Sequence, residues 1–139
     1  MATARAIREG IAANLAPLGH QVSATTLANP WPPCAFVQGP SIEYDRTFGG
    51  GDDDWTFTVV VLVGDAVDQA AQEALDEYMA RDGARSVKAL IESDRRLGGA
   101  CSDLRVTSAS GPRLYASDTP NGPSAAPMLG CEWTVQVIS

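Results

Sequence analysis

Three consecutive carboxylates give this 139-residue sequence its sharpest chemical feature. Asp52, Asp53 and Asp54 directly follow Gly49-Gly50-Gly51. Carboxylate oxygens can hold Ca²⁺ or Mg²⁺, which both prefer oxygen ligands. The segment lacks the alternating ligand spacing, the following glycine and the distal glutamate of an EF-hand loop. We therefore interpret residues 48–54 as a solvated acidic loop, with a small metal- or ligand-binding domain as the alternative.

The residue types that usually carry catalysis are sparse. His20 is the only histidine and stands beside a glycine that ends a helix, which is typical of a surface or capping residue. No serine lies in the G-x-S-x-G pattern of a nucleophile elbow. The three glycines before Asp52 are not followed by the Lys and Ser/Thr of a phosphate-binding loop. We predict a protein that is not an enzyme and that uses no cofactor and no metal.

The cysteines give no sign of a metal site. Cys34, Cys101 and Cys131 form no C-x-x-C pair, and a single histidine adds little to a zinc ligand set. We interpret them as buried, reduced thiols in a cytosolic protein. A disulfide between Cys101 and Cys131 stays open as an alternative.

Charge and hydropathy exclude two further classes. The net charge is −7 and the pI about 4.5, which argues against a chain that wraps nucleic acid, because that requires clustered Lys and Arg. No apolar run approaches the roughly 20 residues that span a bilayer, and residues 1–19 lack the apolar core of a secretory signal. The length and the hydrophobic content of 45% predict one domain, residues 1–139, with its own core.

The stretch from Trp55 to Val63 is the element around which the rest should pack. It is the longest apolar run and is rich in β-branched and aromatic residues. Alternation places Trp55 and Phe57 on one face and Thr56 and Thr58 on the other. The second face begins polar and ends apolar, which predicts a central strand that starts near solvent and ends buried on both sides. We expect a neighbouring subunit or partner to cover its first half.

The remaining elements follow from periodicity and from Gly and Pro. Apolar residues at helical spacing predict three helices, capped by Thr3, Asp65 and Ser86, over residues 3–18, 66–80 and 86–93. Further strands are predicted over residues 21–24, 34–38, 41–47, 104–109 and 128–137. Residues 41–47 and 55–63 should form a hairpin, and residues 110–127 a long loop. This order favours an α+β fold, a mainly antiparallel sheet with an N-terminal helix and a central helix pair packed on one face.

Several short motifs occur in a characteristic order. The first half contains Ile7-Arg8-Glu9-Gly10-Ile11 in a helix, Ala35-Phe36-Val37 after a Pro-Pro pair, and Ile42-Glu43-Tyr44-Asp45 with Phe48. The second half contains Asp65-Ala66-Val67-Asp68, Ser86-Val87-Lys88-Ala89-Leu90-Ile91, Leu97-Gly98-Gly99 and Leu129-Gly130. In this order the chain resembles the tail terminator proteins of long-tailed (siphovirus-type) actinobacteriophages. The resemblance covers most of the chain and stops at residues 116–127.

The resemblance implies a structural role. Such proteins form a homohexameric ring on the head-proximal end of the tail tube, stop tube polymerisation and present a surface to which the head joins. The implied partners are further copies of the chain, the major tail tube protein and the head-side neck or connector proteins. Genomic DNA passes through without specific binding, and no membrane is involved. The implied location is the tail and neck of the virion, assembled in the bacterial host cytoplasm.

A ring of this kind makes demands that parts of the sequence could meet. A cyclic ring needs two different complementary patches on each subunit, and a negative lumen would keep DNA from sticking. We expect loops 48–54 and 110–127 at the faces or lumen of the ring, with neighbours pairing through the sheet. Trp31 either packs its Pro-rich segment onto the core or contacts a partner. The candidates for subunit, partner or lumen contact are Trp31, Phe48, Asp52, Asp53, Asp54, Tyr115 and Asp118.

Two other phage structural roles fit a small acidic chain of this kind. One is a different head–tail connector or neck component. The other is a tail tube protein, which would polymerise rather than close as a single ring.

Overall fold

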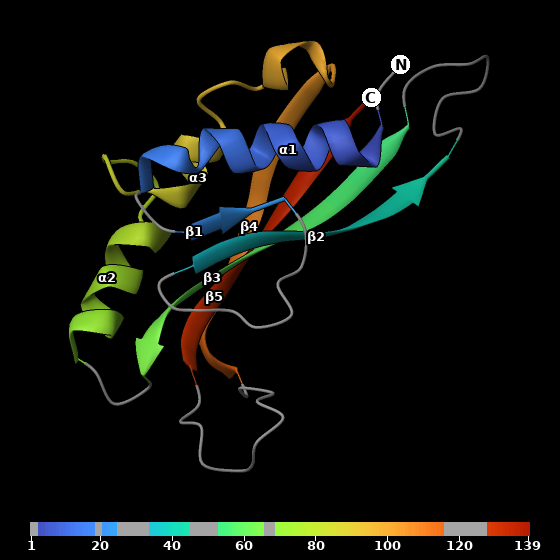
Figure 1. Ribbon diagram of the computed structural model, residues 1–139. Helices are drawn as coiled ribbons and strands as arrows, with labels where there is room; N and C mark the ends of the chain where they lie inside the picture. Colours follow the sequence, from blue (N-terminus) through green and yellow to red (C-terminus); the bar gives the residue numbers. More distant parts are fainter. Residues whose placement is uncertain (1–2, 19–20, 25–33, 45–52, 66–68, 116–127) are drawn as a thin grey trace.

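A computed structural model of the chain describes residues 3–18, 21–24, 34–44, 53–65, 69–115 and 128–139 (Figure 1). Five strands form one sheet in the order β1-β2-β3-β5-β4. The strands are β1 (Gln21–Ser23), β2 (Cys34–Glu43), β3 (Asp54–Asp65), β4 (Asp103–Tyr115) and β5 (Met128–Ile138). β1 runs parallel to β2, and the other neighbours are antiparallel. The predicted mainly antiparallel sheet and the hairpin of β2 with β3 are confirmed.

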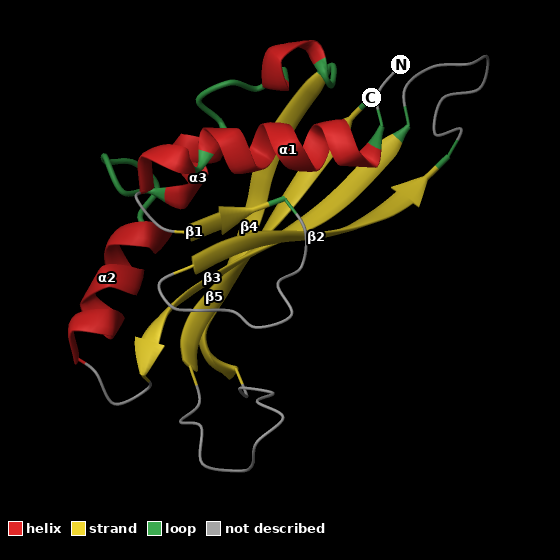
Figure 2. Cartoon of the chain, in the orientation of Figure 1, coloured by secondary structure: helices red, strands yellow, loops and turns green. Residues whose placement is uncertain are grey.

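Helices cover one face of this sheet (Figure 2). They are α1 (Ala4–Asn14), α2 (Gln69–Met79) and α3 (Val87–Ile91), with short 3₁₀ turns η1 (Ala16–Leu18) and η2 (Leu97–Gly99). Two predicted caps are confirmed, since the Thr3 hydroxyl accepts from the Ala6 N–H and the Ser86 hydroxyl from the Ala89 N–H. The α+β class predicted from the order of elements is therefore confirmed.

β3 is the middle strand and has the two-faced burial that its sequence predicts. Phe57 is fully buried beneath the helices, and Trp55 stacks on it with 6.2 Å between ring centroids. On the opposite face, Thr56 is exposed at the start of the strand. Further along, Val60 and Leu62 are buried there in a small cluster with residues of β2. The prediction that a neighbour must cover the first half is wrong, because Trp55 and Phe57 are already buried within one chain.

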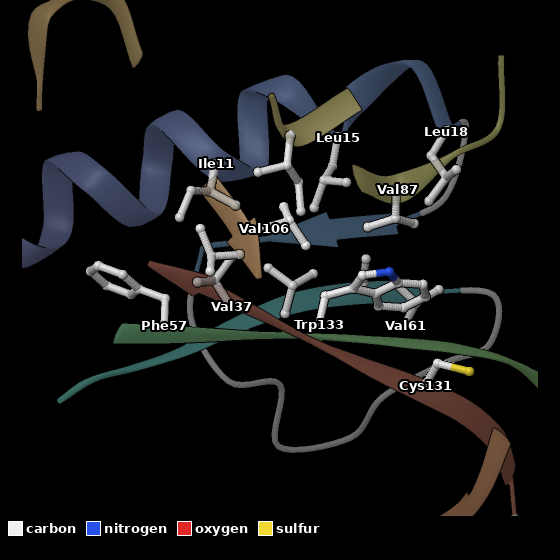
Figure 3. Packing of buried hydrophobic residues seen from close by; sticks show 14 of the residues in the cluster. Ile11, Leu15, Leu18, Val37, Phe57, Val61, Val87, Val106, Cys131 and Trp133 are labelled. Atoms are coloured by element: carbon white, nitrogen blue, oxygen red, sulfur yellow. The ribbon is translucent and has the colours of Figure 1, made fainter. Parts of the chain in front are cut away.

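The main core fills the space between α1, α3 and the sheet. Figure 3 shows Ile11 of α1 and Leu15, the residue that follows the helix, pointing toward the sheet, where they meet the layer that contains Phe57 and Trp133. A Cβ added at Gly10 would lie 2.8 Å from the Cβ of Leu97, so α1 rests directly on η2. This close approach joins α1 to the segment that precedes β4.

Two Gly-Pro pairs lie inside strands rather than between them. β2 continues through Gly39-Pro40 with a register shift between Gln38 and Ser41, so the prediction of two separate strands is wrong. β4 likewise continues through Gly111-Pro112 to Tyr115, so the predicted loop does not begin at residue 110. Both peptide bonds are cis. In each case a bulge accommodates the glycine and proline, so the strand bends and continues.

Three predicted boundaries also need correction. α1 ends at Asn14, and its last predicted turn is the 3₁₀ turn η1. α2 begins at Gln69, and Asp65 pairs with Met128 as the last residue of β3, while residues 66–68, where the helix was predicted to start, lie outside the described residues. β3 begins at Asp54, which removes that residue from the predicted loop 48–54.

Candidate assembly surfaces

The acidic triplet does not act as one solvated cluster. Asp54 is buried in β3, and both its carboxylate oxygens accept from the Gln136 side-chain amide at 3.1 Å. The backbone of Asp53 exchanges two hydrogen bonds with Ser139, at 2.7 and 3.1 Å. These contacts join the start of β3 to the end of β5, so Asp54 has a structural role and the interpretation of it as a solvated loop residue is wrong.

Most of the other predicted contact residues lie outside the described part of the chain. Trp31, Phe48, Asp52 and Asp118 lie outside the described residues, and so does His20. Tyr115 is the last residue of β4 and pairs with Met128. Among the residues that the structure describes, no group of three or more His, Cys, Asp or Glu side chains is placed to share a metal ion. No helix in the same part of the chain is long and apolar enough to cross a membrane.

The cysteines are free and buried, as predicted. Burial raises the pKa of Cys101 to about 11 and that of Cys131 to about 11. Nearby carboxylates add to the effect, Asp103 and Asp94 at Cys101 and Asp76 at Cys131. Because the thiolate is the reactive form, these residues are poor nucleophiles at neutral pH. They contribute to packing instead.

The outer edge of β4 is a candidate surface that the sequence did not predict. β4 is the last strand of the described sheet, so one side of its backbone faces no further strand among the described residues. An exposed edge of this kind offers unpaired N–H and C=O groups to another chain. A partner strand could pair with β4 only where no other group already covers this edge.

Side chains of the α3–η2 segment cap the first part of this edge. The Glu92 carboxylate accepts from the Val106 N–H at 3.2 Å, and the Lys88 ammonium donates to the Val106 carbonyl at 3.2 Å. Lys88 and Glu92 also pair with each other. Further along the same segment, Arg95 donates to the Leu104 carbonyl at 3.2 Å and pairs with Asp103 at 2.9 Å. Residues 104–106 therefore cannot accept a further strand without losing these contacts.

The electrostatics of this cap favour its charged state. Partial burial raises the pKa of Glu92, but the hydrogen bonds from Lys88 and from the Val106 N–H outweigh burial, and the net shift is downward. Glu92 is therefore ionised at neutral pH and holds the Lys88 ammonium in place. Sequence analysis missed this arrangement, although the i,i+4 spacing of Lys88 and Glu92 is a local sign that the two side chains meet.

The next part of the edge is open. Residues 107–110 are all exposed, and within the described part of the chain no side chain caps their backbone groups. The bulge between Val106 and Ser108 resets the register, so Ala109 lies opposite Trp133. Because hydrogen-bonded and non-hydrogen-bonded pairs alternate in an antiparallel ladder, Ala109 directs its N–H and C=O outward, as Val106 does.

A groove of about 290 Å³ runs beside this open edge. Residues 106–109 form one side, and Trp133 and Met79 supply its apolar lining. Arg81 and Lys88 add positive charge. The groove thus combines strand-edge hydrogen-bonding groups with the half-buried Met79 and the exposed Arg81, whereas Trp133 is 1% exposed and Lys88 is paired with Glu92. This combination suits an extended segment with an aromatic side chain and negative charge.

Charge is unevenly distributed between the two edges of the sheet. Residues 81–113 contain seven of the ten basic and four of the seventeen acidic residues, a net charge of +3. The other three basic and thirteen acidic residues give the rest of the chain −10. The basic segment comprises α3, η2 and most of β4, whereas β1, β2 and β3 belong to the acidic part. Among the described residues, the end of β2 is acidic, because Glu43 lies opposite Asp54 and near Asp53, whereas the segment that contains α3, η2 and most of β4 is basic.

Comparison with models of known protein families finds no match for this sequence, and comparison with curated proteins finds no significant match.

Proposed function

We propose that this protein is a structural subunit of a closed ring, with the role of a phage tail terminator. In that role the ring would cap the head-proximal end of the tail tube, end its polymerisation and provide the joining surface for the head or neck. The single observation that carries the proposal is the charge difference between the two edges of one sheet. The resemblance of the sequence motifs to tail terminator proteins supplies the particular role.

Two unlike edges favour head-to-tail association. In a cyclic assembly each subunit presents one patch to the neighbour on one side and a different patch to the neighbour on the other. Attraction between opposite charges speeds encounter and fixes orientation, and it disfavours pairing of like edges. A basic β4 edge and an acidic end of β2 meet this requirement within one small chain.

The chemistry of the described residues agrees with a structural role. The buried cysteines have raised pKa values, and Glu92 is ionised and committed to a cap on β4. Asp54, which could have supplied a cation ligand, is instead satisfied by Gln136. Each of these groups supports the fold of β3, β4 and β5.

The proposal is tested by the assembly state and by tube capping. The purified chain would be studied by native mass spectrometry and negative-stain microscopy, first without and then with tail tubes. A ring of six that binds one end of the tubes and halts their growth is the expected result. Long tubes formed by the chain itself would favour a tube protein. Rings that bind a head-side connector but leave tube length unchanged would favour a neck component.

A further inference from the structure

The open part of the β4 edge and its groove form a docking site that no contact within the described chain uses. Residues 107–110 supply the strand edge, and Trp133, Met79 and Arg81 line the adjacent groove. Arg81 is exposed, and no ion pair in the described part of the chain involves it. A ligand for this site needs an extended backbone, an aromatic group and negative charge.

The opposite edge of the sheet presents such a segment. β1 pairs with β2 only from Cys34 to Phe36, so no described strand lies on the outer side of the rest of β2. Part of that side is closed, because Arg8 donates to the Gly39 carbonyl at 2.9 Å and Pro40 has no N–H. The end of β2, which forms a tip of the sheet in Figure 1, is left with Tyr44 at 69% exposure.

This tip has the charge that the groove requires. Among the described residues of this tip, 41–44 and 53–54, Glu43, Asp53 and Asp54 are acidic and none is basic. Arg81 of the groove belongs to the segment 81–113, which carries +3. Tyr44 is also one of only two large hydrophobic side chains that are strongly exposed among the described residues, the other being Ile138. An exposed tyrosine at a strand tip is a typical interface anchor, since it buries a large area and keeps a polar end.

We infer that residues 41–44 of a second copy of this chain dock along residues 107–110 of β4, with Tyr44 in the groove against Met79 and Arg81. The contact is head-to-tail, because it joins opposite edges of the sheet, and repeated around an axis it closes a ring. It rests on the proposed function by naming the surfaces through which neighbouring subunits would meet. Pairing between the two copies stops at residues 104–106, because side chains already cap their backbone groups. This stop fixes the register of the docked segment on β4.

Cysteine cross-linking tests this contact. One tagged chain carries Ser41→Cys, which keeps Tyr44 in place, and a differently tagged chain carries Thr107→Cys, Ser108→Cys, Ala109→Cys or Ser110→Cys. These positions are exposed, so the substitutions should leave the fold intact. The native cysteines are buried and should give little background. After mild oxidation, at least one pair should form the mixed disulfide about tenfold faster than Ser41→Cys mixed with Gln72→Cys, an exposed control on α2.

A second variant tests the chemistry of the groove. Arg81→Glu in the chain that carries the β4 cysteine should slow the mixed cross-link several-fold, and added salt should reduce the difference. Mixed cross-linking no faster than the Gln72→Cys control at all four positions overturns the contact. Preferential cross-linking of the Ala109→Cys chain with itself overturns it too, because two β4 edges would then meet.

The two proposals fail in different ways. Six-membered rings that cap tubes without any enriched mixed cross-link would keep the terminator role and remove this contact. Enriched cross-links in open filaments, with no closed ring, would keep the contact and remove the proposed role.

Discussion

The two halves of the outer edge of β4 show how one strand can be closed and open along its length. At residues 104–106, Lys88, Glu92 and Arg95 satisfy the outward backbone groups, and the side chains of Leu104 and Val106 are buried. At residues 107–110, every residue is exposed and the groove lies alongside. The bulge at Thr107 separates the two halves. The difference teaches that the fold depends on the first half, while the second is free to be used in assembly.

The largest expected effect comes from a core residue in the closed half. Leu104→Ala should destabilise the protein by about 2–5 kcal/mol, because it leaves a cavity under a buried strand. Thr107→Ala, in the open half, should change stability by no more than about 0.5 kcal/mol. Urea unfolding followed by tryptophan fluorescence measures both. Equal effects of the two substitutions would remove the distinction between the halves.

Next in size is a substitution at the far end of the open half. Gly111 has φ 138°, and a Cβ there would lie 2.8 Å from the Cys131 sulfur. Gly111→Ala should therefore be about 1–3 kcal/mol more destabilising than Gly83→Ala, because overpacking adds to backbone strain. Gly83 is a matched control, with φ 113° and no neighbour within 4 Å of the added Cβ.

A second substitution separates the contact from the strain. Combining Gly111→Ala with Cys131→Ala should recover part of the lost stability relative to the sum of the single substitutions. Strict additivity would mean that the sulfur contact does not limit this position. The positive φ of Gly111 would then account by itself for the loss of stability in Gly111→Ala.

The edge cap itself should have a smaller but measurable effect. Glu92→Ala removes the acceptor of the Val106 N–H and leaves Lys88 without its carboxylate, so it should cost about 1–3 kcal/mol. Glu73→Ala is the control, since the Glu73 carboxylate accepts an exposed hydrogen bond from the Gln69 side chain within the same helix. Its effect should stay within about 0.5 kcal/mol. Similar losses for both variants would show that the cap does not hold β4.

Sequence reasoning predicted the parts of this molecule that depend on local chemistry. The alternation from Trp55 to Val63 predicted the central strand, and Thr3 and Ser86 marked two helix starts correctly. The errors have tertiary causes. Gly39-Pro40 and Gly111-Pro112 are typical of turns, but pairing with β3 and β5 keeps both segments in the sheet as bulges. Asp54 appears to belong to a loop until Gln136, 82 residues away along the chain, becomes its partner.

The candidate surface was harder to predict than the fold, for the same reason. Arg81 and Lys88 lie far from Trp133 in the sequence, and only the sheet order and the position of α3 bring them to one groove. Their charge signal was nevertheless present in the sequence, because seven of ten basic residues lie between residues 81 and 113. Counting charge by segment rather than over the whole chain would have indicated this edge.

The smallest expected effect is the pH dependence of the cap. The pKa of Glu92 is lowered in the folded protein, so its contribution to stability is fully present above the ordinary glutamate value, 4.5, and is lost as pH falls through the lowered folded value. The stability difference between the native protein and Glu92→Gln should therefore be constant near neutral pH and shrink on acidification. Urea unfolding of both proteins between pH 7 and about pH 3 measures it. The contrary result is a stability difference between the two proteins that stays constant down to about pH 3. That result would mean that the charge of Glu92 does not help to cap residues 104–106, and that its hydrogen bonds alone do so.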